Sequence, residues 1–346
     1  MDYISHRPLS EKVENRLMSA AKILDTTNPA LQLKRLIAKT FALPEGDARY
    51  GRNALTPMAA PFEPSFSELQ PNVLRFTIEP LGPGASGLDR RDEATREMRR
   101  LLAEHFGREA LHWFDKQSEA WRGFGSGTNL GYGAFFGTTS DRDGLAAAKV
   151  YYETDENQLS ALPAGLINII KIVTSLMPEL RPLFTTLSAM RGEGGQRLTF
   201  AQPKAVKISD FQPLLDALGL GNRMPGLLQT IGLTLGGRFD LPANSCLVAF
   251  GQDAEGLPEF ELYVMLGMIP DVPVNFLQLL SLGLSERPRE LIALERWLSA
   301  FTPDDDVWPG RFSILSLRTG HRTPPRVSIY LRPAEFELPV RAQQAA

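Results

Sequence analysis

The sequence predicts an α+β protein, a ten-stranded antiparallel β-barrel surrounded by α-helices. Two helical segments followed by a β-hairpin recur about five times, at intervals of roughly 60 residues. Each hairpin has an apolar face, which requires a covering layer of helices, and a polar face with charged and tyrosine side chains. A closed sheet with helices outside satisfies both faces and exposes no strand edge. An open sheet with one solvated face fits the same alternation, but the regular repeat favours closure.

The composition and net charge of the chain exclude several classes of protein. The chain has 346 residues, a formal net charge of -3, 43% hydrophobic residues and 22% charged residues, as in ordinary soluble domains. A slightly acidic chain argues against a nucleic-acid partner or an anionic membrane surface. The first residues lack the apolar core of a secretion signal, and the most apolar helical segment, Leu162–Met177, is too short to span a bilayer. We therefore expect a cytoplasmic protein with no membrane partner.

A single barrel domain is expected over residues 1–346. Residues 1–50 are expected to supply N-terminal helices, because apolar residues recur at helical spacing from Ser10 to Phe41. Asn28 and Pro29 mark a break between two such helices. Residues 334–346 follow the last expected strand and end in RAQQAA, so we expect them to form a flexible tail.

The first hairpin lies within residues 61–80. Two extended segments, Pro61–Ser67 and Val73–Glu79, flank a polar turn. Phe62 and Phe66 share the apolar face of the first segment. The opposite face of the two segments carries Glu63, Ser65, Ser67, Arg75, Thr77 and Glu79. An isolated surface hairpin has the same two faces, and only the repetition of this pattern along the chain favours a common sheet.

The remaining elements follow the same order of helices and then a hairpin. Further hairpins are expected at residues 130–153, 184–201, 245–266 and 311–333. Helices are expected at residues 92–106, 112–120, 161–183, 209–218, 225–235, 275–284 and 289–301. The turn of the third hairpin is expected at Gly192–Gly195, and Ser209 is expected to cap the helix that follows it.

The barrel interior is expected to be a polar chamber lined with aromatic side chains. Its expected cations are Arg75, Lys149, Arg197 and Arg326. Its expected tyrosines are Tyr151, Tyr263 and Tyr330, and its carboxylates are Glu63, Glu79, Glu153 and Glu261. Clustered Arg and Lys suit a diphosphate, and tyrosine ring faces suit a cation. An allylic diphosphate that ionises offers both, although a solvated strand face explains any single Lys-x-Tyr pair.

The motifs TPMAAPFEPSFS, VLRFTIEPLGPGASG, AKVYY and RVSIYLRP, in this order, resemble the aromatic prenyltransferases of the dimethylallyltryptophan synthase type. The resemblance spans residues 55–333 and implies the family's prenyltransferase barrel of five ααββ repeats. It implies that Glu63 holds the indole N–H of the acceptor. It also implies that Arg75, Lys149 and Arg197 bind the diphosphate, and that Tyr151, Tyr263 and Tyr330 shield the allylic cation. Arg326, the further inward cation, is expected to bind the diphosphate with them.

The resemblance also implies that no cofactor and no catalytic metal are needed beyond the co-substrate, a prenyl diphosphate. The sequence agrees, because no DDxxD pair is present: in PDDDVW, Trp308 stands where the last Asp would fall. The four histidines show no metal-ligand spacing. The single cysteine, Cys246, lies in an apolar run that is typical of a buried small residue.

Several positions depart from the family pattern. Thr199 and Ala201 replace a cation and a shield tyrosine, and the smaller Ala201 leaves room for a longer chain such as geranyl. Glu261 stands where Gln or Lys is usual, and Arg326 where a tyrosine is common. Glu153 stands near the amino-acid end of the acceptor site, where tryptophan-using members often have a tyrosine.

The sequence therefore predicts a prenyltransferase that binds two small molecules, a prenyl diphosphate and an indole or related aromatic acceptor. Prenyl transfer of this kind belongs to secondary metabolism, such as alkaloid biosynthesis. Two alternatives remain open. The same fold can act on a phenolic or peptide-borne acceptor, or the barrel can bind a hydrophobic ligand without catalysis. The sequence does not define the acceptor, the attacked atom or the oligomeric state.

Overall fold

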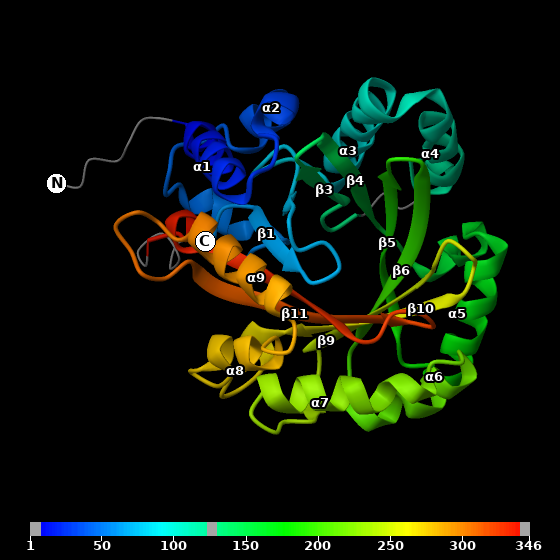
Figure 1. Cartoon of the computed structure of the whole chain (residues 1–346). Coiled ribbons are helices and arrows are strands. Elements are labelled where there is room, and N and C mark those ends of the chain that lie inside the picture. Colours follow the sequence, from blue (N-terminus) through cyan, green and yellow to red (C-terminus); the bar gives the residue numbers. More distant parts are fainter. Residues whose placement is uncertain (1–7, 123–129, 340–346) are drawn as a thin grey trace.

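The structure, a computed structural model, describes residues 8–122 and 130–339. Its main sheet is a closed barrel with the strand order β1-β12-β11-β10-β9-β6-β5-β4-β3-β2. Every neighbouring pair in the barrel is antiparallel. The helices lie around the outside of this barrel (Figure 1). The prediction of a closed ten-stranded barrel with outer helices is confirmed.

The strands of the barrel form five consecutive hairpins. These are β1 (Phe62–Ser67) with β2 (Leu74–Ile78), β3 (Ala134–Asp141) with β4 (Gly144–Glu153), β5 (Arg181–Met190) with β6 (Glu193–Gln202), β9 (Cys246–Gln252) with β10 (Pro258–Met265), and β11 (Gly310–Gly320) with β12 (Arg326–Pro333). Two short strands, β7 (Val206–Lys207) and β8 (Asp240–Leu241), form a separate sheet that the sequence did not predict.

The helices precede the hairpins, mostly in pairs. The α-helices are α1 (Leu9–Leu24), α2 (Ala30–Thr40), α3 (Gly87–Leu101), α4 (Gly107–Arg122), α5 (Ala164–Leu176), α6 (Gln212–Ala217), α7 (Met224–Thr234), α8 (Phe276–Gly283) and α9 (Pro288–Phe301). Helix α3 begins with a capping box, in which the Ser86 side chain accepts from the Asp89 N–H and the Asp89 carboxylate accepts from the Ser86 N–H. A short π-helical turn joins α3 to α4.

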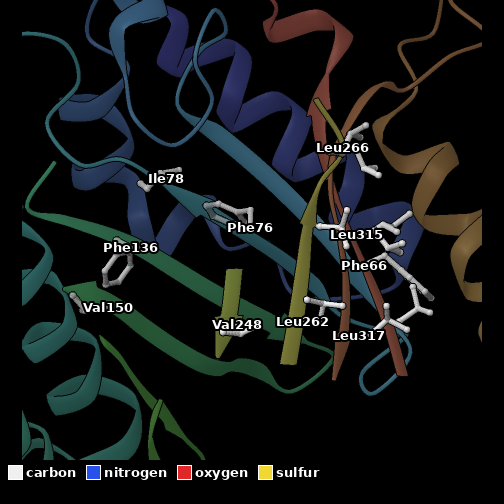
Figure 2. Packing of buried hydrophobic residues seen from close by; sticks show 14 of the residues in the cluster. Phe66, Phe76, Ile78, Phe136, Val150, Val248, Leu262, Leu266, Leu315 and Leu317 are labelled. Carbon is white, nitrogen blue, oxygen red and sulfur yellow. The ribbon is translucent and has the colours of Figure 1, made fainter. Parts of the chain in front are cut away.

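Strand alternation separates the two sides of the barrel wall. On β4, the buried residues Val150 and Tyr152 alternate with Lys149 and Tyr151, which keep accessible surface. The buried residues face the helix layer: Phe66, for example, lies 6.2 Å, between ring centroids, from Trp297 of α9. Apolar residues from several strands occupy this layer (Figure 2). The hydrophobic core of the protein therefore lies between barrel and helices, and polar residues face inward.

Tyr152 provides a test of this assignment. Its hydroxyl lies 2.8 Å from the hydroxyl of Thr95 on α3, and Thr95 in turn donates to the Arg91 carbonyl. Both side chains are buried, so Tyr152→Phe leaves the Thr95 oxygen without its donor. We expect a loss of about 1 kcal/mol in the free energy of unfolding, measured by urea denaturation. Unchanged stability would contradict the outward position of this ring.

Several predicted boundaries were wrong. Residues 181–183 were expected in a helix, but they open strand β5, because α5 ends just before Pro178. The third hairpin turns at Arg191–Gly192, and Gly194 and Gly195 lie inside β6. Ser209 does not cap α6, which begins at Gln212 after a 3₁₀ turn.

The C-terminal segment also differs from the expected flexible tail as far as residue 339. Phe336 and Leu338 are buried, and the Phe336 ring lies 5.2 Å from that of Phe62 between centroids. Glu335 pairs with Arg16 of α1. Apolar packing therefore fixes this segment against the barrel, whereas residues 340–346 lie outside the described part of the chain.

Two further expectations concern membrane-spanning helices and the single cysteine. In residues 8–122 and 130–339, no helix combines the length and the apolar character needed to cross a membrane. Cys246 is buried, as its apolar surroundings predicted, and burial raises the pKa of its thiol to about 12.

Candidate active site

Four cationic side chains gather inside the barrel. Arg75, Lys149, Arg197 and Arg318 lie at inward positions of β2, β4, β6 and β11. Burial, together with the charges of Arg75, Arg318 and Arg197, lowers the pKa of Lys149 to about 7, although the charge of Glu261 opposes this shift. These four residues, the cation cluster below, are therefore close enough for their charges to interact.

Two carboxylates of β10 lie among these cations. Glu259 Oε2 is 3.2 Å from Arg197 Nη1 and 2.5 Å from Arg318 Nη2. Glu261 Oε2 is 3.1 Å from Arg197 Nη2, and its other oxygen accepts from Ser316 Oγ at 2.9 Å. Burial alone would raise the pKa of Glu261, but the charges of Arg197 and Arg318 hold it below its usual value. Both carboxylates are therefore counter-ions within the cluster.

The cation cluster retains donors without partners. Arg75 Nε donates to Ser65 Oγ at 2.8 Å, but its Nη2 is buried without a hydrogen bond. Among the described residues, the same holds for Arg197 Nε and Arg318 Nε, whereas Arg197 Nη2 has Glu261 beside it. A buried N–H without an acceptor is costly, and several in one place fit an anionic ligand with several oxygens.

A glycine on the neighbouring strand gives Arg197 its position. A Cβ at Gly251 on β9 would lie 2.8 Å from Arg197 Cγ, too close for a carbon contact. The bare backbone at Gly251 therefore lets the Arg197 side chain lie across the barrel wall towards Glu259.

The three predicted tyrosines lie together beside the cluster. The Tyr263 and Tyr330 rings are 6.4 Å apart between centroids. Tyr151 forms a hydrogen bond with Thr77, and its charge interactions include Arg75 and Glu261. Burial raises the pKa of all three phenols, so they remain neutral.

Gly137 on β3 makes room for one of these rings. A Cβ at Gly137 would lie 3.3 Å from Tyr151 Cε2 and 3.3 Å from Thr77 Oγ1. The absence of a side chain at Gly137 therefore lets the Tyr151 ring lie against the barrel wall. The three tyrosines together offer ring faces and neutral hydroxyls to a bound cation.

Glu63 lies on β1, two residues before Ser65, which stands opposite Tyr330. It is 4% exposed and accepts a hydrogen bond from Ser313 Oγ at 2.7 Å. Burial raises the pKa of its carboxyl to about 7, and the Ser313 hydrogen bond and the Arg332 charge oppose that rise. Tyr151 and Tyr330 are near enough to feel its charge. Glu63 can therefore accept a hydrogen bond from a ligand beside the tyrosine rings.

The structure does not bring three predicted residues into this group. Glu153 accepts from three backbone N–H groups, of Gly131, Tyr132 and Gly133, at 2.8 to 3.0 Å, so its carboxylate holds a loop. Glu79 likewise accepts from Ala54 and Leu55 and pairs with Arg90. Arg326 lines a groove beside α7 and α8 and lies 3.7 Å from Glu68. Strand alternation alone could not reveal these loop and rim contacts.

Sequence reasoning missed Arg318, Glu259 and Ser313. The alternation of Ser316 and Arg318 with Leu315 and Leu317 is visible in the sequence, but Arg318 lies on the first strand of its hairpin, whereas the expected cations all lie on second strands. Ser313 points inward because of an irregularity in β11 between Phe312 and Ile314, which no periodic pattern reveals. In the described residues, no group of three or more His, Cys, Asp or Glu is placed to hold a metal ion.

Comparisons with known proteins address the fold. No protein-family model matches the chain, and no curated protein matches its sequence. A solved structure of 5-dimethylallyltryptophan synthase from Streptomyces coelicolor is 17% identical, with a TM-score of 0.71 over 97% of this chain and 100% of that one. The chain has the prenyltransferase barrel fold. The expected resemblance is thus confirmed at the level of fold.

Two further structures support the same barrel. A 6-dimethylallyl tryptophan synthase is 16% identical, with a TM-score of 0.73 over 96% of this chain and 98% of that one. The 6-dimethylallyltryptophan synthase from Micromonospora olivasterospora, solved with DMASPP and Trp, is 15% identical, with a TM-score of 0.71 over 96% and 99%. In this chain, the cation cluster, the tyrosines and Glu63 lie near enough to one another for charge interactions: Arg75 and Glu63 both act on Tyr151 and Tyr330.

Proposed function

We propose that this protein is an aromatic prenyltransferase that transfers an allylic prenyl group from a prenyl diphosphate to an indole or related aromatic acceptor. One observation carries the proposal: the barrel interior combines a cation cluster with unpartnered N–H donors, three neutral tyrosines and a buried carboxylate. These groups match, in this order, a diphosphate, an allylic cation and an acceptor N–H.

The chemistry follows from that order. Arg75, Lys149, Arg197 and Arg318 bind the diphosphate, and the allylic C–O bond breaks with its electron pair leaving on the diphosphate oxygen. The rings of Tyr151, Tyr263 and Tyr330 stabilise the cation and exclude water from it. A ring carbon of the acceptor then forms the new C–C bond, and a base removes the ring proton. Electrostatic stabilisation of the separating charges supplies most of the rate enhancement.

Glu63 supports an indole as the acceptor. Its carboxylate accepts a hydrogen bond and stabilises the positive charge that the ring acquires during attack. The solved barrels from Micromonospora olivasterospora and of PriB were determined with tryptophan and a dimethylallyl thiolodiphosphate, a pair of ligands of the same chemistry.

A phenolic or peptide-borne acceptor is the second candidate, and Glu153 favours it. Glu153 was expected to bind the acceptor, in place of the tyrosine that tryptophan-using members often have near its amino-acid end, but three backbone N–H groups already occupy its carboxylate. An acceptor without a free amino group needs no such partner.

The test is product formation. Acceptors of each class, namely tryptophan, tryptophan-containing peptides, simple indoles and phenols, are incubated with dimethylallyl, geranyl or farnesyl diphosphate and analysed by mass spectrometry. We expect an acceptor heavier by one prenyl group, with the proton lost. Ligand binding without any product from any pair would indicate a non-catalytic hydrophobic-ligand-binding barrel.

Turnover is expected to continue in EDTA. The proposed site balances the diphosphate charge with side chains of the cation cluster, so a chelator removes nothing that it needs. Initial rates with and without EDTA, and with added magnesium, check this expectation. Strict dependence on magnesium would contradict a site that works through its side chains alone.

A further inference from the structure

The two carboxylates of β10 need an explanation that diphosphate binding does not give. Glu259 and Glu261, the acidic pair below, lie within 3.2 Å of guanidinium nitrogens of the cation cluster. They are 9% and 7% exposed. Carboxylates at these positions weaken diphosphate binding. Each carboxylate repels the anionic ligand and accepts hydrogen bonds from donors that the ligand would use.

Glu259 competes most directly with a bound anion. One of its oxygens, Oε2, is shared by Arg197 and Arg318, which come from strands on opposite sides of β10. Both guanidinium groups keep a buried Nε–H for which the described part of the chain offers no acceptor. Glu259 therefore neutralises part of their charge and accepts one hydrogen bond from each, but leaves the Nε donors available to a ligand.

The consequence differs between substrate and product. When the allylic C–O bond breaks, the electron pair stays with the diphosphate, so the fully ionised free diphosphate carries one more negative charge than its prenyl ester. Repulsion by a fixed carboxylate scales with ligand charge and therefore acts more strongly on the product.

We propose that the acidic pair is an internal counter-charge that weakens the hold of the cation cluster on free diphosphate and so promotes its release after transfer. The inference rests on the proposed function. It assigns to Glu259, and secondarily to Glu261, a role in product release, separate from the chemical step.

The alternative role for these residues is structural, and it predicts the opposite sign. If Glu259 served only to hold Arg197 and Arg318 in position, its removal would disorder both donors and weaken anion binding. If it is a counter-charge, Glu259→Gln keeps the shape and a hydrogen-bond acceptor but removes the repulsion, and anions bind more tightly.

The experiment is isothermal titration calorimetry on the full chain with two probes, inorganic diphosphate and dimethylallyl thiolodiphosphate. We expect Glu259→Gln to tighten inorganic diphosphate by about tenfold or more, as removal of one nearby charge implies. The gain for the thiolodiphosphate ester should be smaller. Glu261→Gln, the second variant if the first fails to fold, should act in the same direction.

Glu255→Gln is the matched control. It makes the same charge change on the exposed β9–β10 turn, where Glu255 pairs with Arg322, and should leave both affinities as in the unmodified protein. Unchanged or weaker diphosphate binding in both β10 variants would overturn the inference alone. Failure of the unmodified protein to bind either probe would overturn the proposed function, and the inference with it.

Discussion

Replacing Glu63 by Gln is expected to lower the rate of prenyl transfer by about 10²–10³, the cost of removing one comparable charge-stabilising group from an active site. Glu63 is 4% exposed, and Ser313 holds its carboxylate in place. A carboxylate at this position stabilises the positive charge that grows on the acceptor ring, whereas the neutral Gln amide does not. Gln has nearly the same shape, so folding and diphosphate affinity should change little.

Single-turnover kinetics with a proven acceptor measure this effect on the chemical step. The control is Ser313→Ala, measured well above pH 7: the variant loses the hydrogen bond that lowers the pKa of Glu63, but at that pH it keeps the ionised carboxylate and should cost much less. Chemistry at the normal rate in Glu63→Gln would exclude Glu63 from the mechanism. Because the pKa of its carboxyl is about 7, transfer should also fall as the pH drops below 7, where the carboxylate is protonated.

Arg75→Ala and Lys149→Met are expected to weaken prenyl-diphosphate binding by about 10- to 100-fold each, as the loss of one hydrogen bond to a charged group implies. Both residues belong to the cation cluster, and Arg75 Nη2 has no hydrogen-bond partner among residues 8–122 and 130–339. Affinity for the acceptor should change much less. Calorimetry with dimethylallyl thiolodiphosphate measures the first quantity and titration with the acceptor the second.

Arg326→Ala tests whether Arg326 binds the diphosphate, as the sequence predicted, or lies outside the cation cluster, as in the structure. Arg326 lies near Glu68, at a groove beside α7 and α8, so its loss should leave diphosphate affinity nearly normal. A loss as large as that of Arg75→Ala would return Arg326 to the site. Normal affinity in both Arg75→Ala and Lys149→Met would refute the cation cluster as the diphosphate site.

The same cluster gives a pH dependence with a definite sign. The pKa of Lys149 is lowered to about 7, so its ammonium form dominates below that pH in the free protein. A diphosphate binds the charged form better, and affinity should therefore decrease as the pH rises through 7. Lys149→Met should remove this part of the pH profile, which isolates it from the titration of the ligand itself.

The sequence predicted the fold well because its pattern is repeated. Alternation on β4 and β12 placed Lys149, Tyr151 and Tyr330 on the inner face, and helical spacing placed the core of α1 and α9. Boundaries failed where the local pattern is ambiguous. Residues 181–183 follow closely on the apolar run of α5, but the helix ends before Pro178, and Arg181 and Pro182 pair with β6.

The candidate site was less predictable because it depends on contacts between distant segments. Glu153 and Glu79 stand at positions where strand alternation predicts an inward side chain. Their carboxylates instead accept hydrogen bonds from backbone N–H groups of nearby loops. The alternation of residues along a strand does not indicate which loop packs against the end of that strand. Conversely, the role of Glu259 becomes visible only when Arg197 and Arg318, more than 100 residues apart in sequence, meet its carboxylate.

The pairing of β1 with β12 has a consequence for synthesis. These strands, near opposite ends of the chain, form the seam of the barrel, where Ser65 stands opposite Tyr330. On the ribosome β1 emerges early and must wait for nearly the whole chain before its partner exists, leaving an unpaired edge that can aggregate. Glu63 and Tyr330 flank this seam, so a nascent protein cannot assemble the active interior until its final hairpin has left the exit tunnel.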